Sequence, residues 1–171
     1  PSGLHRWNSS YQCYSIHRVL ASMPAVPDPF QWIALMRSDL QFTAKELARK
    51  LSTPTNVDWS RLKKAARYLK KTRNWSLTLH HNSEAPMSII VYCDASWSGP
   101  GGKSTTGFAI WLQDVLIHTA SKTQAVIALS VGEAELCGNN SATADAMFLR
   151  YLLWPIVGFD LPIQVWTDSS T

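Results

Sequence analysis

The chain has 171 residues, of which 46% are hydrophobic and 16% are charged, and its formal net charge is +4. This length is enough to bury a core, and the low charged fraction argues against a disordered chain. The three cysteines, Cys13, Cys93 and Cys137, lie far apart with no CxxC pair, which argues against a disulfide framework and a zinc site. No apolar run is long enough to cross a bilayer, and residues 1–20 lack the apolar stretch of a signal peptide.

Charge is distributed unevenly along the chain. Residues 37–73 carry eleven Lys and Arg against three acids, whereas residues 88–171 carry three basic residues against seven acids. A basic segment beside an acidic one is typical of a protein that binds a polyanion with one part and gathers carboxylates in another. A solvated helix surface would give the same counts, so charge alone leaves both interpretations open.

The first part of the chain is predicted to be irregular and then helical. Residues 1–29 show no clear period, and the prolines near their end would break a helix. The apolar spacing over residues 30–51 predicts one helix, which the following STPT sequence ends. A second helix is expected from Asp58, a good N-cap residue, to about Thr72.

Extended segments dominate from residue 75 onward. WSLTLHH (75–81) alternates like a strand, and SIIVYCD is short, apolar and rich in β-branched residues. GFAIWL, VLIHTA and the apolar PIQVW are also predicted to be strands. Gln113 and Asp114 form a tight connection, and a helix is predicted over residues 130–153, followed by a break at Pro155 and Gly158. The order after residue 85 is therefore β-β-β-α-β. It predicts an α/β fold with a mixed sheet, in which the crossover helix makes the last strand parallel to a neighbour.

Two of the predicted strands end in an aspartate. Asp94 follows IIVYC, and Asp168 follows IQVWT. If the crossover lays these strands side by side, their carboxyl ends meet at one edge of the sheet, where the two carboxylates repel each other unless a cation neutralises them. A hard divalent ion with oxygen ligands, Mg²⁺ in particular, suits such a pair. Each aspartate taken singly would instead be a solvent-facing strand end.

The predicted helix supplies a third candidate carboxylate. Ser130 and Glu133 have the spacing of a capping box, which assigns Glu133 to the start of the helix. Glu135 points elsewhere around the helix and is free to face the sheet edge, whereas Asp145 is expected to be solvated or locally bonded. The predicted metal-binding residues are therefore Asp94, Glu135 and Asp168, and any catalytic role would belong to the same three.

Five motifs then point to a family. They occur in the order YCDASWSG, GKSTTGF, ASKTQAVIALSVGEAEL, ADAMFLRYLL and VWTDSS. Together they resemble the ribonuclease H domain of copia-type LTR-retrotransposon polyproteins. Upstream, RSDLQFTAKELARKLSTPTNVDWSRLKKAARYLKKT looks like the segment that joins reverse transcriptase to ribonuclease H in those polyproteins. The resemblance covers roughly residues 30–171.

The resemblance implies three regions: an irregular N-terminal segment (1–29), a helical reverse-transcriptase connection (30–81) and a ribonuclease H-like domain (82–171) truncated at its C-terminus. It implies two Mg²⁺ ions, or Mn²⁺ in their place, held by the three carboxylates, and endonucleolytic hydrolysis of the RNA strand of RNA–DNA hybrids. The partners would be the hybrid and the remainder of the polyprotein, with no membrane and no disulfide partner. The setting would be the cytoplasm, within a retrotransposon particle, or the nucleus.

Departures from the family pattern keep an alternative open. The family site has a fourth acid, or an equivalent, beyond the fourth strand, and the chain ends three residues after Asp168. Ser96 stands where family members often have a second aspartate. The alternative is a catalytically inactive relic that binds nucleic acid or serves only as a structural fragment. Because the chain begins with proline, we expect a piece or a processed product of a longer protein.

Basic residues of the second predicted helix are candidates for nucleic-acid binding. Seven Lys and Arg occur between Arg61 and Arg73 without an acid, although a solvated face would look the same. The glycine-rich loop at 98–104 imitates a nucleotide-binding loop, but bulky Trp97 and the strand that follows argue against a nucleoside triphosphatase. We expect Trp97 to pack against the loop and His118 to be a satisfied strand residue. The predicted nucleic-acid-binding residues are Arg61, Lys64, Arg67, Lys71, Lys103 and Ser104.

Overall fold

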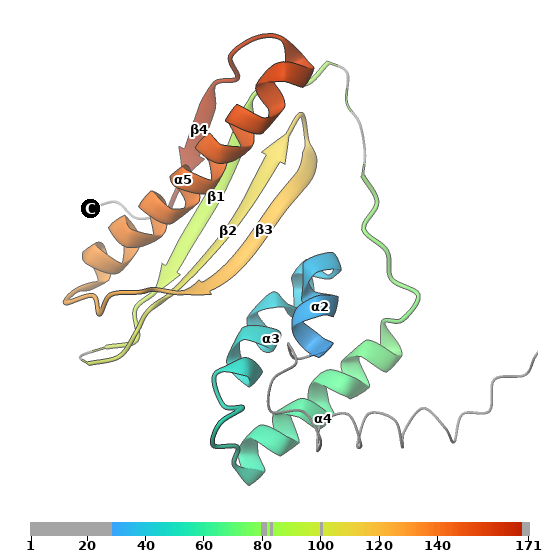
Figure 1. The fold of residues 1–171 in the computed structure, drawn as a ribbon, viewed down its shortest axis with the longest axis vertical. Coiled ribbons are helices and arrows are strands. Elements are labelled where there is room, and N and C mark those ends of the chain that lie inside the picture. The colour runs from blue at the N-terminus through green and yellow to red at the C-terminus, as the bar shows by residue number, and fades with distance from the viewer. Residues whose placement is uncertain (1–28, 80–81, 83, 100, 169–171) are drawn as a thin grey trace, which may run out of the picture.

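The computed structural model describes residues 29–79, 82, 84–99 and 101–168. Figure 1 shows a helical part at one end and a sheet that carries one long helix at the other. The elements in chain order are α2 (Pro29–Met36), the 3₁₀ turn η1 (Ser38–Leu40), α3 (Gln41–Ala48), α4 (Asn56–Lys71), β1 (Ile89–Ser96), β2 (Thr105–Leu112), β3 (Val115–Thr123), α5 (Val131–Val157) and β4 (Ile163–Trp166). Residues 1–28 of the predicted irregular segment lie outside the described residues.

The single helix predicted over residues 30–51 is wrong, because the chain leaves the helical conformation at Arg37. This residue has φ −127° and ψ 87°. Its guanidinium donates hydrogen bonds to the Asp39 carboxylate (2.7 Å) and to the carbonyl and hydroxyl oxygens of Thr72 (3.1 and 2.9 Å), just beyond α4. These bonds fix the interruption, so two short helices and a 3₁₀ turn replace one helix.

The helical part has a small core of its own and a capping box at the start of α4. Its buried members are Phe30, Ala34, Leu40, Ala44, Leu47 and Ala65. The N-cap of α4 is Thr55 and not the predicted Asp58. The Thr55 hydroxyl accepts a hydrogen bond from the Asp58 N–H (3.3 Å), and the Asp58 carboxylate accepts one from the Thr55 N–H (3.1 Å). Asp58 therefore occupies the third helical position, as the reciprocal bonds of a capping box require.

Residues 75–79 do not form a strand, contrary to the prediction for residues 75–81. They run as an extended connection between α4 and β1 (Figure 1). The side chains of Trp75, Leu77 and Leu79 are mostly exposed. An alternating sequence becomes a strand only where a neighbour supplies hydrogen bonds and packing, and none of the described strands pairs with this segment. His80 and His81 lie outside the described residues.

The sheet has the predicted mixed topology. Its strand order is β3-β2-β1-β4; the first three strands are antiparallel neighbours, and β4 is parallel to β1. The β2–β3 hairpin turns through Gln113 and Asp114, which have positive φ angles of 46° and 63° as a two-residue connection of this kind requires. The fold is therefore α/β with a four-stranded mixed sheet and helices.

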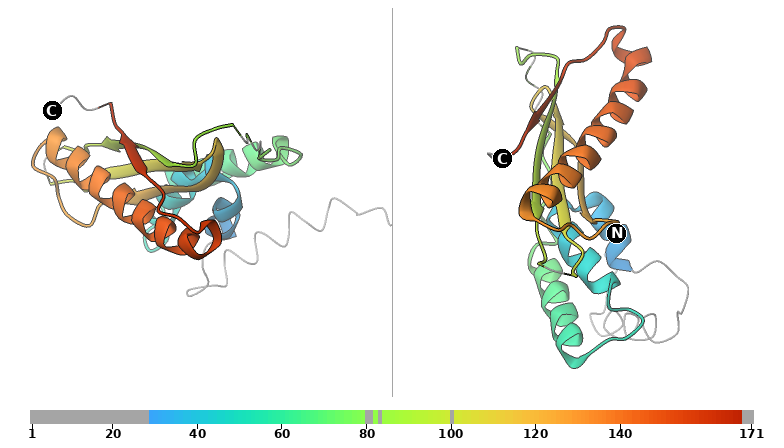
Figure 2. Two further views of the ribbon diagram at one scale, coloured as in Figure 1. Left: turned by 90° about the horizontal axis from the view of Figure 1, so that it is seen from above. Right: turned by 90° about the vertical axis from the view of Figure 1, so that its left-hand side faces the viewer.

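Helix α5 covers one face of the sheet (Figures 1 and 2). Its Ala142 and Ala146 belong to a buried core with Ile89, Val91 and Ile110 of the sheet. Gly138, which weakens the helix by intrinsic propensity, lies where the helix approaches the sheet closely. A Cβ atom at this position would lie 3.3 Å from the Ala95 Cβ. The glycine therefore permits the close packing of α5 on β1.

Of the break predicted at Pro155 and Gly158, the part at Pro155 is wrong and the part at Gly158 is confirmed. Helix α5 includes Pro155 and ends at Gly158, whose left-handed φ of 81° and N–H bond to the Trp154 carbonyl (2.9 Å) close the helix. Pro155 lies in the last turn, where its missing N–H removes one helical hydrogen bond, and the helix tolerates that loss.

The sequence predicts neither a membrane-spanning segment nor a disulfide. No helix in the described part of the chain is long and apolar enough to cross a membrane. Cys93 and Cys137 are both free thiols, and Cys13 lies outside the described residues.

Candidate metal centre

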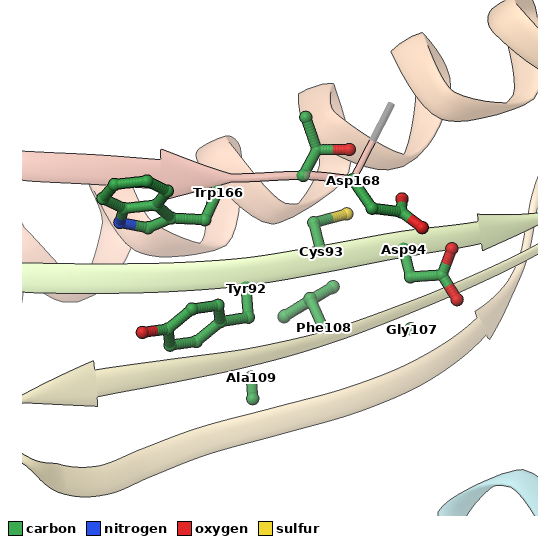
Figure 3. Close-up of a pocket in the computed structure, with 9 residues that line it drawn as sticks. Tyr92, Cys93, Asp94, Gly107, Phe108, Ala109, Trp166 and Asp168 are labelled. Carbon is green, nitrogen blue, oxygen red and sulfur yellow. The ribbon is translucent and has the colours of Figure 1, made fainter. Parts of the chain in front are cut away.

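Asp94 and Asp168 lie at the same edge of the sheet. Tyr92 of β1 and Trp166, the last residue of β4, are register partners in the parallel pair. Asp94 lies two residues after Tyr92, and Asp168 lies two residues after Trp166. Figure 3 shows the two carboxylates beyond the end of β4. Because β4 stops there while β1 continues to Ser96, the space beside Asp94 is free for side chains from another element.

Glu135 reaches this space from the start of α5. Ser130 caps the helix by accepting a hydrogen bond from the Glu133 N–H at 3.2 Å, and Glu133 Oε2 accepts one from the Leu129 N–H at 2.6 Å. Glu133 therefore serves the helix start, as its spacing predicts, although its carboxylate bonds to Leu129 and not to the cap residue itself. Glu135, two residues on, faces inward and is 7% exposed.

A buried glutamine that the sequence analysis did not single out anchors this end of α5. The side-chain amide of Gln124 donates hydrogen bonds to the Ala134 carbonyl (2.7 Å) and to the Thr106 hydroxyl (3.0 Å). Because Ala134 directly precedes Glu135, these bonds set the position of Glu135 relative to the sheet. The sequence signal for Gln124 was its place in the ASKTQ motif, since a single buried glutamine has no periodic pattern.

The three carboxylates form one cluster. An oxygen atom from each of Asp94, Glu135 and Asp168 lies within 4.8 Å of the other two. The ion pairs among the described residues all involve other acids. Burial raises the pKa of Glu135 above its usual value, and the charges of Asp94 and Asp168 raise it further, while a hydrogen bond from the Ala95 backbone opposes them.

The cluster fits a hard divalent cation. Glu135 Oε2 is buried and has no hydrogen-bond partner among the described residues. A buried acceptor in this state is costly, and a cation would both satisfy it and offset the repulsion between the carboxylates. The neighbouring thiol is a poor ligand, because burial raises the pKa of Cys93 to about 11, with Glu135 and Asp94 adding to the effect. An all-oxygen donor set suits hard divalent ions such as Mg²⁺, Ca²⁺ and Mn²⁺.

The predicted nucleic-acid-binding residues differ in accessibility. The exposed ones are Arg61, Lys64, Arg67 and Lys71 on α4 and Lys103 in the β1–β2 loop. Ser104 is fully buried, so the prediction that it touches nucleic acid is wrong. Its hydroxyl accepts a hydrogen bond from the Ser98 N–H (3.4 Å) and its carbonyl accepts one from the Gln124 N–H (2.8 Å), so it holds the loop. One basic residue of α4 is also paired, since Arg61 lies 3.3 Å from Asp58.

The remaining candidates have structural contacts. Trp97 donates its indole N–H to the Ala128 carbonyl (3.0 Å) and packs against Ala95, Ala128 and Ala134. It therefore has a packing role, but these contacts are with β1, α5 and the segment before α5 and not with the expected glycine-rich loop. Asp145 accepts a hydrogen bond from the Lys122 ammonium (2.7 Å) and lies 3.4 Å from the His118 imidazole. Asp145 is therefore locally bonded and His118 is a satisfied strand residue, both as expected. The glycine-rich loop leads into β2 and not into a helix, which argues further against a nucleoside triphosphatase.

Comparisons with known proteins relate the chain to transposon polyproteins. No protein-family model and no solved structure matches it. An uncharacterized mitochondrial protein of Arabidopsis thaliana is 31% identical over 61% of this chain and 44% of its own length. The retrovirus-related Pol polyproteins from the Arabidopsis thaliana transposons RE2 and RE1 are each 28% identical, over 78% and 72% of this chain but only 10% and 8% of their own lengths. The chain thus spans less than half of these relatives, and its similarity to part of a retrotransposon Pol polyprotein is confirmed.

Proposed function

We propose that this chain is a segment of a copia-type retrotransposon Pol polyprotein that hydrolyses the RNA strand of RNA–DNA hybrids through a ribonuclease H-like domain at residues 82–171. The observation that supports this best is the meeting of Asp94, Glu135 and Asp168 within 4.8 Å of one another. They come from β1, from α5 and from the segment after β4, which are the elements that the family resemblance assigns to its metal-binding acids.

The order of the elements supports the ribonuclease H-like assignment of the fold. An antiparallel three-stranded meander leads into α5, which crosses over so that β4 lies parallel to β1. This arrangement places the ends of β1 and β4 beside the start of the crossover helix. A reactive centre at that edge is consistent with the general rule that ligands of open α/β sheets bind at the carboxyl ends of the strands.

Asp94, Glu135 and Asp168 would hold the metal ions, Mg²⁺ or Mn²⁺. Two such ions, when bound, supply an activated water for in-line attack on the phosphodiester and stabilise the leaving 3′ oxygen. The chain's own contribution is to assemble the carboxylates beforehand. Strand pairing fixes the two aspartates, the Gln124 amide fixes the start of α5, and the Glu135 oxygen that lacks a hydrogen-bond partner among the described residues stays free for a cation.

The exposed basic face of α4 and Lys103 would attract the phosphates of the hybrid through long-range, salt-dependent electrostatics. The RNA strand would be distinguished from DNA by contacts to its 2′-hydroxyl groups. The proposed setting is a retrotransposon particle in the cytoplasm or the nucleus, with the rest of the polyprotein as partner.

A cleavage assay tests the proposal. The 171-residue chain is incubated with an RNA–DNA hybrid labelled on the RNA strand, in Mg²⁺ or Mn²⁺. We expect metal-dependent RNA cleavage that Asp94→Asn reduces by at least about 100-fold, because loss of one ligand charge removes several kcal/mol of metal-derived stabilisation. The matched control is Asp114→Asn, the same chemical change at an exposed turn residue, which should leave the rate unchanged. Hybrid binding without cleavage by the parent, in both metals, would instead support the inactive relic.

A further inference from the structure

A groove leads from Asp94 to the helical part of the molecule. It has a volume of about 540 Å³. Ser96, Thr105 and Gln41 are among the residues that supply polar groups to its lining, whereas Phe42 and Ala120 supply apolar surface. Because the groove ends at a carboxylate of the cluster and combines polar with apolar surface, it suits an extended ligand that has both kinds of surface.

The floor of the groove next to Asp94 is open. Asp94 pairs in register with Gly107, and Ser96 pairs with Thr105, so these four residues lie on one face of the sheet. No atom lies within 4 Å of the position that a Cβ of Gly107 would occupy. A ligand backbone can therefore approach the sheet closely at this point.

Lys45 of α3 does not itself line the groove, but it reaches Thr105, which does. Its ammonium donates a hydrogen bond to the Thr105 hydroxyl (2.7 Å), lies 3.0 Å from the Glu46 carboxylate and sits 4.7 Å from the centre of the Phe42 ring. The side chain is 12% exposed. An ammonium group has three N–H donors, and the described polar contacts of Lys45 use two of them, which leaves one for a ligand.

The spacing between Lys45 and Asp94 matches a nucleic-acid strand. Thr105, which holds the ammonium, is a diagonal neighbour of Asp94 across β1 and β2. Diagonal neighbours on a sheet are about 7–8 Å apart, and a strand of a duplex rises about 3.4 Å per nucleotide. A cation at Thr105 is therefore one or two nucleotides from a phosphate held at Asp94.

We propose that Lys45 binds a backbone phosphate of the nucleic-acid strand that occupies this groove, one or two nucleotides from the carboxylate cluster. In the helical part, α3 would then form one wall of the substrate site, while α4 would present a separate basic face. Asp39 also lines the groove and is paired with Arg37 at 2.7 Å. Lys45 lies 3.0 Å from the Glu46 carboxylate, so a phosphate would share its ammonium with that carboxylate. Gln41 anchors this wall by donating a hydrogen bond to the Thr119 carbonyl (3.0 Å). The inference rests on the proposed function for its substrate class.

Binding is tested separately from cleavage, with the full chain and an RNA–DNA hybrid in EDTA at a series of salt concentrations. Lys45→Met should weaken binding by about 3–10-fold and lower the slope of log K against log salt by about one, as loss of a single phosphate contact does. Lys50→Met, which removes an exposed lysine of the same segment, should change neither. Lys45→Arg should restore both the affinity and the slope, because it keeps the charge.

A merely structural role of Lys45 is distinguished by comparing the salt slope with the thermal stability of each variant. A structural defect in Lys45→Met would lower Tm and affinity but keep the parental salt slope, whereas loss of a phosphate contact lowers the slope. If Lys45→Met does not fold, the parent chain itself is tested with a hybrid that carries a photo-crosslinker on a phosphate two nucleotides from the cleaved bond. The crosslinked peptide should contain residues of α3.

The outcomes separate the two proposals. A parental affinity and salt slope in Lys45→Met, or crosslinks that avoid α3, would overturn the assignment of Lys45 even if the parent cleaves RNA. A Lys45-dependent salt slope in a parent that does not cleave RNA would support the groove and overturn the ribonuclease proposal.

Discussion

The carboxylates of the helical part and those of the cluster at the sheet edge have opposite environments. In the helical part each described acid has a partner. A hydrogen bond from Arg37 holds the pKa of Asp39 below its usual value, and a hydrogen bond from Thr55 does the same for Asp58. Burial alone would raise the pKa of Glu46, but the hydrogen bonds and charges of two neighbouring basic side chains outweigh it, so this pKa is also lowered. These acids favour the folded state in their charged form.

In the sheet part the acids of the cluster are not ion-paired with any described residue, and the pKa of Glu135 is raised by burial and by the two aspartates. Charged carboxylates that repel one another make folding less favourable. This difference separates the acids that stabilise the fold from the acids that are available to bind a ligand. Paired acids in the helical part stabilise it, whereas the cluster carries a cost in stability that a bound cation would remove.

The largest expected effect is stabilisation of the sheet part by metal. Mg²⁺ at about 100 times its dissociation constant should stabilise the folded chain by about 2.7 kcal/mol, which is a rise in Tm of about 5–10 °C for a chain of this size. Asp168→Asn should lose most of this rise, while Asp114→Asn should keep it. The measurement is a thermal melt with and without Mg²⁺. An equal rise in the parent and in Asp168→Asn would place the cation elsewhere.

A smaller effect is expected from removing one charge of the cluster. Without metal, at pH 7, Glu135→Gln should raise Tm by about 2–4 °C because it removes like-charge repulsion while keeping the shape. The pKa of Glu135 is higher in the folded than in the unfolded chain, so the penalty is absent at low pH and develops as pH rises through these pKa values. The gain should therefore vanish near pH 3. A lower Tm in Glu135→Gln at pH 7 in EDTA would contradict the idea that repulsion among the three carboxylates destabilises the metal-free chain.

The smallest effect is expected from the opposite change in the helical part. Asp39→Asn should lower Tm at pH 7 by about 1–3 °C, because it weakens the bonds to Arg37 and Tyr68 at a partly exposed pair. The pKa of Asp39 is lowered by folding, so its contribution is complete above the unfolded pKa and is lost as pH falls through the folded one. Parent and variant should converge at low pH. Glu84→Gln, at an exposed acid, is the control and should change Tm at neither pH.

Local rules predicted most of the sheet part. Short apolar runs predicted β1, β2 and β3, and the Gln113-Asp114 pair predicted the hairpin turn. The convergence of Asp94 and Asp168 followed from a crossover that makes two strands parallel. The choice of Glu135 over Glu133 followed from capping chemistry, because Glu133 is used at the helix start. In each case the deciding interactions lie within a few residues or follow from topology.

The elements that could not be predicted depend on distant partners. The interruption at Arg37 is fixed by Thr72, which lies 35 residues away along the chain. Residues 75–79 alternate like a strand but have no strand to pair with among those described. Ser104 resembles a loop contact in sequence, and only its bonds to Ser98 and Gln124 show that it is buried. Lys45 is one of many basic residues until α3 packs beside the sheet.

We infer above all that the three carboxylates from β1, from α5 and from the segment after β4 together bind a divalent cation. The most direct measurement is a crystal structure of the chain with Mn²⁺, with anomalous scattering used to locate the metal. We expect an anomalous peak bounded by oxygens of Asp94, Glu135 and Asp168, and its loss in Glu135→Gln. Saturating Mn²⁺ that leaves no peak between these carboxylates, or a peak that persists unchanged in Glu135→Gln, would contradict the account.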